Sequence, residues 1–252
     1  MKSAFLTALL LSALPVIAGT PATPITPAPV ASPWECRLSI YGWMESLDGD
    51  IGIRGETVPI DVPFSEILEN LDFTAMGAIE VGRGRWSFVA DGIYASLSDS
   101  ATDGRGGSLK VDLEQFIGNF LVAYELAKTD GYRFDMYAGA RVNSMNVDLY
   151  LKDGSGGKFS GSGSKTWVDP IIGARFQAAL PHNFFFRALG DVGGFDVSST
   201  FTWQALAAIG YNINEHNSVL LGYRAIGTNY SNAGFTYDVD ASGIILGYQY
   251  TF

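Results

Sequence analysis

The chain ends in Gly243-Ile244-Ile245-Leu246-Gly247-Tyr248-Gln249-Tyr250-Thr251-Phe252, the stretch that decides the fold. Successive side chains of a β-strand point to opposite faces, so an extended backbone separates this stretch into two sets. One face carries large apolar residues, namely Ile244, Leu246, Tyr248, Tyr250 and Phe252. The other face carries small or polar residues, with Ile245 as the exception: Gly243, Gly247, Gln249 and Thr251. The pattern predicts a strand with one apolar face.

The same period of two recurs upstream, between breaks rich in Gly, Asn, Asp and Ser. Hydrophobic residues make up 47% of the chain, yet beyond the N-terminal region no apolar run is long enough for a transmembrane helix. A tilted strand needs only about 9 to 11 residues to cross the hydrocarbon layer. Ten segments of this kind are predicted, at about 36–47, 73–81, 86–97, 110–126, 132–149, 166–180, 184–193, 200–213, 218–226 and 239–252.

The connections between these segments alternate in length. Four are short, namely Gly82–Arg85, Ala127–Gly131, Pro181–Asn183 and Asn214–Asn217. Five are longer, namely Asp48–Asp72, Ser98–Ser108, Tyr150–Lys165, Gly194–Ser199 and Gly227–Asp238. Bacterial outer-membrane barrels join short periplasmic turns with longer external loops, and a sheet edge open to lipid would leave backbone groups unpaired. We therefore expect an all-β fold, a single transmembrane antiparallel up-and-down β-barrel of about ten strands. A miscounted hairpin would make it eight or twelve.

The N-terminus indicates export. Lys2 precedes the apolar stretch Ala4–Leu14, and the small or apolar residues 16–18 suit cleavage after Ala18, so residues 1–18 are predicted to be a signal peptide. Residues 19–33 contain half of the protein's 10 prolines and are predicted to be a periplasmic linker. Residues 34–252 would then form the barrel in the bacterial outer membrane.

Charged residues on the faces opposite the greasy ones would point into the barrel. They are Arg37, Glu45, Glu80, Asp91, Glu125, Arg133, Asp135, Arg141, Asp169, Arg175, Arg187, Asp191 and Arg224. We predict that they form an ion-pair network across a narrow lumen, where bulk water is scarce. A polar conduit that selects solutes remains the other interpretation. Ten strands favour the first, because barrels of about eight strands are filled by side chains and wide channels need about 16.

The first long connection contains a helical pattern. Its apolar residues follow the i, i+3, i+4, i+7 spacing, namely Phe64, Ile67, Leu68 and Leu71. Ser65 is a candidate N-cap, so one or two helical turns are predicted in this external loop. These apolar residues would cap or plug the lumen. A mobile gate and a docking element for a partner are the alternatives.

Several segments carry a family resemblance. They are Pro63–Phe73, Gly84–Trp86, Tyr137–Arg141, Trp167–Arg175, Asp191–Phe195 and Leu221–Arg224. Together they resemble poorly characterised small, porin-like outer-membrane β-barrels of Gram-negative bacteria, and the resemblance covers most of the chain after the linker. It implies no assigned catalytic residues. Tyr248, Tyr250 and Phe252 also resemble the signal read by the outer-membrane assembly machinery. The expected partners are therefore that machinery, periplasmic chaperones and outer-membrane lipid.

Charge and composition exclude other classes. The formal net charge of −10 argues against a nucleic-acid partner, which would need a basic stripe. The chain has only two histidines, His182 and His216, and both fall in short turns. We therefore expect no enzyme, no catalytic residues, no metal and no cofactor.

The predicted function is a narrow or closed pore that contributes to envelope integrity or to limited passage of small solutes. The alternative is a surface-interaction or adhesion barrel that acts through the loops at 48–72, 98–108 and 150–165, and a membrane-embedded hydrolase ranks third.

Overall fold

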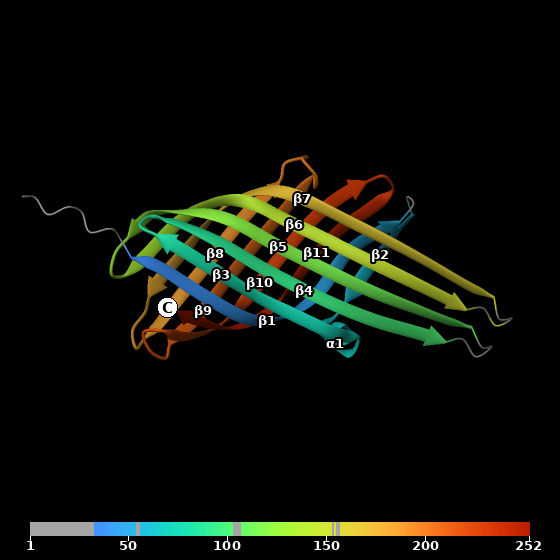
Figure 1. Ribbon diagram of the computed structural model, residues 1–252, viewed down its shortest axis with the longest axis horizontal. Coiled ribbons are helices and arrows are strands. Elements are labelled where there is room, and N and C mark those ends of the chain that lie inside the picture. Colours follow the sequence, from blue (N-terminus) through green and yellow to red (C-terminus); the bar gives the residue numbers. More distant parts are fainter. Residues whose placement is uncertain (1–32, 54–55, 103–106, 153, 155–156) are drawn as a thin grey trace, which may run out of the picture. The chain divides into compact units, whose positions relative to one another are not determined.

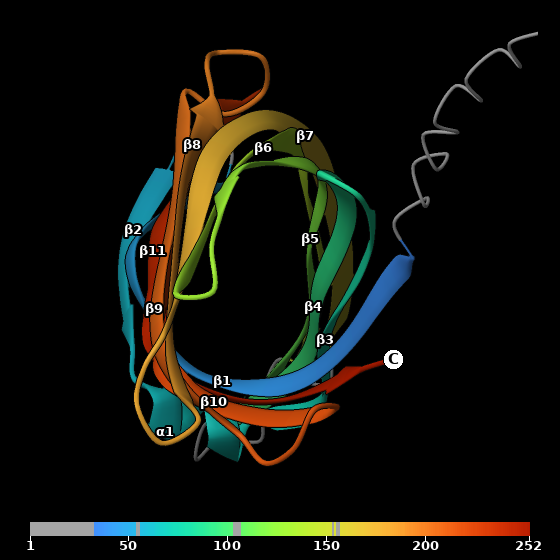
Figure 2. The same ribbon diagram turned by 90° about the vertical axis from the view of Figure 1, so that its left-hand side faces the viewer.

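Eleven strands and one short helix make up the computed structural model, which describes residues 33–53, 56–102, 107–152, 154 and 157–252. Their bounds are β1 Trp34–Ile53, β2 Glu56–Val62, α1 Phe64–Glu69, β3 Leu71–Arg83, β4 Trp86–Thr102, β5 Ser108–Lys128, β6 Tyr132–Lys152, β7 Lys158–Ala179, β8 Phe184–Gly194, β9 Phe201–Asn212, β10 Asn217–Asn232 and β11 Phe235–Thr251. Each strand pairs antiparallel with its neighbour, and pairing of β11 with β1 closes the sheet into the ring seen end-on in Figure 2. The predicted signal peptide and all of the predicted linker except Pro33 lie outside the described residues.

The prediction of a barrel with about ten strands is confirmed, because β2 is an addition to the wall rather than a member of it. On one side, β1 pairs with β11 from Arg37 to Gly52. On its other side, the first part of β1 pairs with β3 and the last part, from Leu47 to Ile53, pairs with β2. The remaining ten strands each correspond to one predicted segment, and no segment extends more than one residue beyond its strand.

The predicted long connections are shorter than expected, because the strands run on through most of them. The stretch 98–108 is largely the ends of β4 and β5, and 150–165 is largely the ends of β6 and β7. The same holds for 227–238 in β10 and β11, and for the β1–β2 hairpin within 48–72. These stretches lack an apolar outer face, but backbone pairing between adjacent strands needs no lipid contact. The strands therefore project beyond the rest of the wall, as Figure 1 shows for β4 to β7.

The helix predicted in the first external connection is present as α1, although its N-cap differs from the prediction. Pro63 occupies the N-cap position, and its carbonyl accepts a hydrogen bond from the N–H of Ile67 at 3.2 Å. Ser65 lies inside the first turn. The Ile67 side chain is buried, while Leu68 is 55% exposed, and the helix packs against β1. Within the described residues, no helix has the length and apolar content to span a membrane.

The two faces of the wall follow the predicted alternation. In β11, Leu246 is 55% exposed whereas its neighbour Ile245 is 3% exposed and points inward. Corresponding alternations run along β5, β6 and β9. The outward apolar side chains thus form a continuous apolar surface around the ring. Exposing a surface of this size to water would be unfavourable, whereas contact with lipid acyl chains is favourable.

Aromatic side chains gather on this surface at the end of the barrel where β1 begins and β11 ends. They pack in pairs with ring centroids 4.7 to 6.2 Å apart, namely Trp86 with Tyr124, Tyr132 with Phe176, Phe184 with Tyr211 and Tyr250 with Phe252. Rings of this kind mark the membrane–water interface of transmembrane barrels. Short turns and the first and last described residues lie at the same end, so this end faces the periplasm.

We expect arginine on the lipid face to destabilise the barrel according to its depth. Leu246→Arg should lower the free energy of unfolding by about 2–4 kcal/mol, because it places a charge within the hydrocarbon layer. Ser162→Arg, on the exposed outer face of the projecting part of β7, should cost about 0–1 kcal/mol. Urea unfolding of barrels folded into phospholipid vesicles measures both. Equal costs at the two positions would contradict the assignment of the lipid face.

Candidate functional site: the barrel interior

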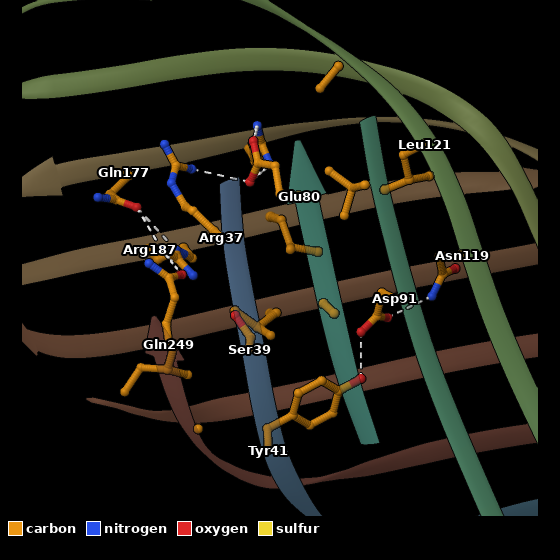
Figure 3. Close-up of a pocket in the computed structure, with 18 of the residues that line it drawn as sticks. Arg37, Ser39, Tyr41, Glu80, Asp91, Asn119, Leu121, Gln177, Arg187 and Gln249 are labelled. Atoms are coloured by element: carbon orange, nitrogen blue, oxygen red, sulfur yellow. Dashed lines mark hydrogen bonds and ion pairs between the residues drawn. The ribbon is translucent and has the colours of Figure 1, made fainter. Parts of the chain in front are cut away.

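The barrel encloses a cavity of ≈ 180 Å³ on the periplasmic side of its interior (Figure 3). A second cavity of ≈ 360 Å³ lies at the periplasmic mouth, next to the β3–β4 turn. Arg37, Glu80 and Arg133 line both cavities, so the inner one adjoins the mouth. Its side chains come from strands on every side of the ring. Most of the charged residues predicted to face the lumen lie around it.

Six of these residues form what we call the periplasmic cluster: Arg37, Glu80, Glu125, Arg133, Asp135 and Arg175. Glu80 accepts hydrogen bonds from Arg37 at 3.2 Å and from Arg175 at 2.5 and 3.0 Å. Asp135 accepts from Arg175 at 2.5 Å and from Arg133 at 2.9 Å. Arg133 also lies 3.4 Å from Glu125. The cluster thus joins three arginines to three carboxylates, and Arg37 also pairs with the exposed Glu35 at 3.2 Å.

Four more form the central cluster: Asp91, Arg141, Asp191 and Arg224. Arg141 donates to Asp191 at 2.7 Å, and both side chains are 0% exposed. Arg224 donates to Asp91 at 2.8 Å across the barrel, from β10 to β4. Neutral polar groups complete these bonds. They include Tyr41, which donates to Asp91, and Asn119, Tyr137, Thr202 and Gln204.

The remaining three predicted members, Glu45, Asp169 and Arg187, form no ion pair within the described residues. Asp169 is fully buried, and Ser199 satisfies it by donating its N–H and its hydroxyl, each at 2.7 Å. It therefore holds the β8–β9 connection against β7. The strand register places Asp169 opposite Arg141, but the Arg141 guanidinium reaches other partners. Sequence spacing alone does not reveal this choice.

An apolar layer lies on the external side of the central cluster. Its buried members are Trp43, Ile93, Ile117, Ile226, Ala241 and Ile245. Four of them lie two residues further from the periplasm, on the same strand, than a side chain that belongs to the central cluster or is hydrogen-bonded to it. Ile93 lies beyond Asp91 in this way, and Trp43 lies beyond Tyr41. The Arg224 guanidinium packs over the Trp43 ring at 5.4 Å. We did not predict this layer, although Ile245, the exception in the C-terminal pattern, was its signal.

A second apolar cluster lies still further out. It consists of Met145, Trp167, Tyr230, Tyr237 and Val239, with the Trp167 and Tyr230 rings stacked at 4.3 Å. The helix residues predicted to plug the lumen lie towards the same end of the barrel, where Ile67 is buried, Phe64 and Leu71 are half-buried and Leu68 is exposed (Figure 1). Their role as a plug or gate stays a prediction.

The two histidines lie where the sequence places them, in short turns at the periplasmic end. His182 is in the β7–β8 turn, and His216 is in the β9–β10 turn with its Nδ1 2.8 Å from the Thr251 carbonyl oxygen. In the part of the chain that the structure describes, no group of three or more His, Cys, Asp and Glu side chains is arranged to hold a metal ion.

Comparison with solved structures identifies the class of fold. The outer membrane protease OmpT from Escherichia coli is similar over 90% of this chain and 99% of that chain, with a TM-score of 0.55 and 12% identity. Neisserial surface protein A matches 88% of this chain and 99% of its own at 10% identity, with a TM-score of 0.34. Ail of Yersinia pestis matches 87% and 98% at 12% identity, with a TM-score of 0.35. The last two superpose too loosely to support an inference.

Three features define a transmembrane β-barrel of the bacterial outer membrane: the closed ring, the apolar outer surface and the aromatic side chains at its periplasmic end. The likeness to OmpT agrees with this fold. The resemblance to Gram-negative outer-membrane barrels is thereby confirmed. No protein-family model and no curated protein matches the chain. At 12% identity the likeness to a protease shows the fold alone.

We expect the Arg141–Asp191 pair to matter for stability mainly as a pair. Arg141→Met should lower the free energy of unfolding by about 3–5 kcal/mol, because it leaves Asp191 buried without its cation. The double variant Arg141→Met with Asp191→Leu should recover most of that loss. Lys110→Met breaks an exposed pair with Asp112 and should leave stability unchanged. Urea unfolding of the four proteins checks this, and no recovery in the double variant would contradict it.

Proposed function

We propose that this protein is a non-enzymatic outer-membrane barrel whose lumen is closed, and that it contributes to envelope integrity rather than to solute flow. The observation that carries the proposal is that two barriers follow one another along the interior. The central cluster fills the lumen with charge-assisted hydrogen bonds. The fully buried Arg141–Asp191 pair joins β6 to β8, and the partly buried Arg224–Asp91 pair joins β10 to β4 across the barrel. The apolar layer around Trp43 follows directly behind it.

Each barrier opposes a permeating ion for a different reason. At the central cluster, an ion would have to displace partners from an Arg–Asp pair that is already desolvated, and separating such a pair costs several kcal/mol. At the apolar layer, the ion would lose its hydration without gaining polar contacts. The cavity on the periplasmic side is therefore a dead end in this structure.

The position of the histidines supports the exclusion of hydrolase chemistry of the histidine-dependent kind. A general base must lie within hydrogen-bond reach of its nucleophile. His182 and His216 lie in periplasmic turns, and the His216 ring contacts a backbone carbonyl and stacks on Tyr250. Neither joins the carboxylates of the interior clusters.

A second candidate function is interaction at the cell surface, which the length of the external hairpins favours. β5, β6 and β7 have 21, 21 and 22 residues, about twice what a tilted strand needs to cross the hydrocarbon layer. Their tips carry exposed apolar side chains such as Leu151 and Phe159. An adhesion assay on cells that display the full chain, compared with a chain lacking the projecting part of the β6–β7 hairpin, tests this candidate.

We expect the purified barrel to be electrically silent in planar lipid bilayers. The triple variant Trp43→Ala, Ile93→Ala and Ile245→Ala truncates three of the six buried members of the apolar layer. It should produce resolvable conductance steps, because water that enters the layer would hydrate the central cluster and lower the cost of separating its ion pairs. As a matched control, Leu221→Ala, Ile244→Ala and Leu246→Ala shorten three side chains on the lipid face and should stay silent. Stepwise conductance of the unmodified barrel would refute closure.

A further inference from the structure

Arg187 is the charged residue of the inner cavity that neither cluster neutralises. The other charged side chains that line the cavity each form at least one ion pair. Arg187 instead lies between two neutral amides, Gln177 and Gln249, as Figure 3 shows. Arg187 is therefore the charged side chain of this cavity that has no carboxylate partner among the described residues.

The contacts of Arg187 leave capacity for an anion. Its Nε and Nη2 donate to the Gln177 oxygen at 3.2 and 3.0 Å, and Nη2 also donates to the Gln249 oxygen at 3.1 Å. Its Nη1 has no hydrogen-bond acceptor among the described residues. Arg37 is among its electrostatic neighbours, while Glu80, the carboxylate that acts on it, already binds Arg37 and Arg175. A guanidinium in such surroundings matches a carboxylate in charge and in geometry.

Apolar side chains begin immediately beside this charge. Leu189 follows Arg187 on the same face of β8, one inward position further from the periplasm. Three residues of the next strands continue that wall of the cavity: Leu206, Leu220 and Ile245. The paired charges lie largely on the other side, on β3 to β7. Arg187 thus stands at a boundary between a charged region and an apolar one.

We propose that the inner cavity binds a free carboxylate with a single short or medium acyl chain, which enters from the periplasm. The carboxylate binds the Arg187 guanidinium, and the acyl chain lies along Leu189, Leu206, Leu220 and Ile245. Ligand sites in proteins commonly combine an apolar wall with a few placed polar groups. A cavity of ≈ 180 Å³ suits one such chain rather than the two chains of a membrane phospholipid. This binding does not depend on the closed lumen proposed above.

The test is calorimetric titration of sodium octanoate into the full barrel in nanodiscs of phosphatidylcholine, with empty nanodiscs as the blank. Octanoate should bind saturably. Acetate, which lacks the chain, and octanol, which lacks the charge, should each bind at least about tenfold more weakly. No saturable binding of octanoate overturns the proposal. Equal binding of octanol overturns it too, because the charge of Arg187 would then contribute nothing to binding. Equal binding of acetate overturns it because the apolar wall would then contribute nothing.

Two substitutions remove the anion site in different ways. Arg187→Gln deletes the charge, and Gln249→Glu supplies Arg187 with an internal carboxylate, which favours folding while competing with the ligand. Each should weaken octanoate binding at least about tenfold and leave octanol binding unchanged. Lys158→Gln removes the same charge from an exposed position at the external tip and should have no effect. Undiminished octanoate binding by folded Gln249→Glu overturns the proposal.

Discussion

Backbone pairing between β1 and β11 is the constraint on which the rest of this structure depends. In the hydrocarbon layer no water can satisfy a free N–H or carbonyl group, so a sheet that spans it must have no open edge. The register from Arg37 opposite Thr251 to Gly52 opposite Thr236 meets this requirement along nearly the whole of β1. It also brings the two ends of the barrel domain together at the periplasmic rim, where the Phe252 N–H donates to the Cys36 carbonyl at 3.0 Å.

Closure with ten strands in the wall leaves a narrow interior, and the narrowness decides what the inward side chains do. Ten of the thirteen charged residues predicted to face the lumen meet an opposite charge there, because few other partners are within reach and isolation would be costly. The periplasmic cluster lies at the wet end and is partly exposed. The central cluster contains the fully buried Arg141–Asp191 pair, and the apolar layer follows it. The polarity of the lining therefore decreases from the periplasmic mouth inward, so the two ends of the lumen differ.

This gradient shapes what the protein can do. A periplasmic solute can reach the inner cavity but meets the central cluster and the Trp43 layer behind it. Arg187, which forms no ion pair among the described residues, lies on the accessible side of these barriers, beside the apolar wall of β8 to β11. A binding role that faces the periplasm is therefore compatible with a barrier role across the membrane.

The sequence by itself determined the elements and their faces. Alternation is a local property, so the strands, the greasy outer surface and the inward set of charges could be predicted from it, and α1 likewise from its helical spacing. Only the tertiary structure decided which charge meets which. Arg141 lies opposite Asp169 in the register but binds Asp191 on β8, and Arg224 on β10 binds Asp91 on β4. Such choices depend on strand tilt, stagger and the width of the closed ring, which bring together residues far apart in the chain and leave no local pattern in it.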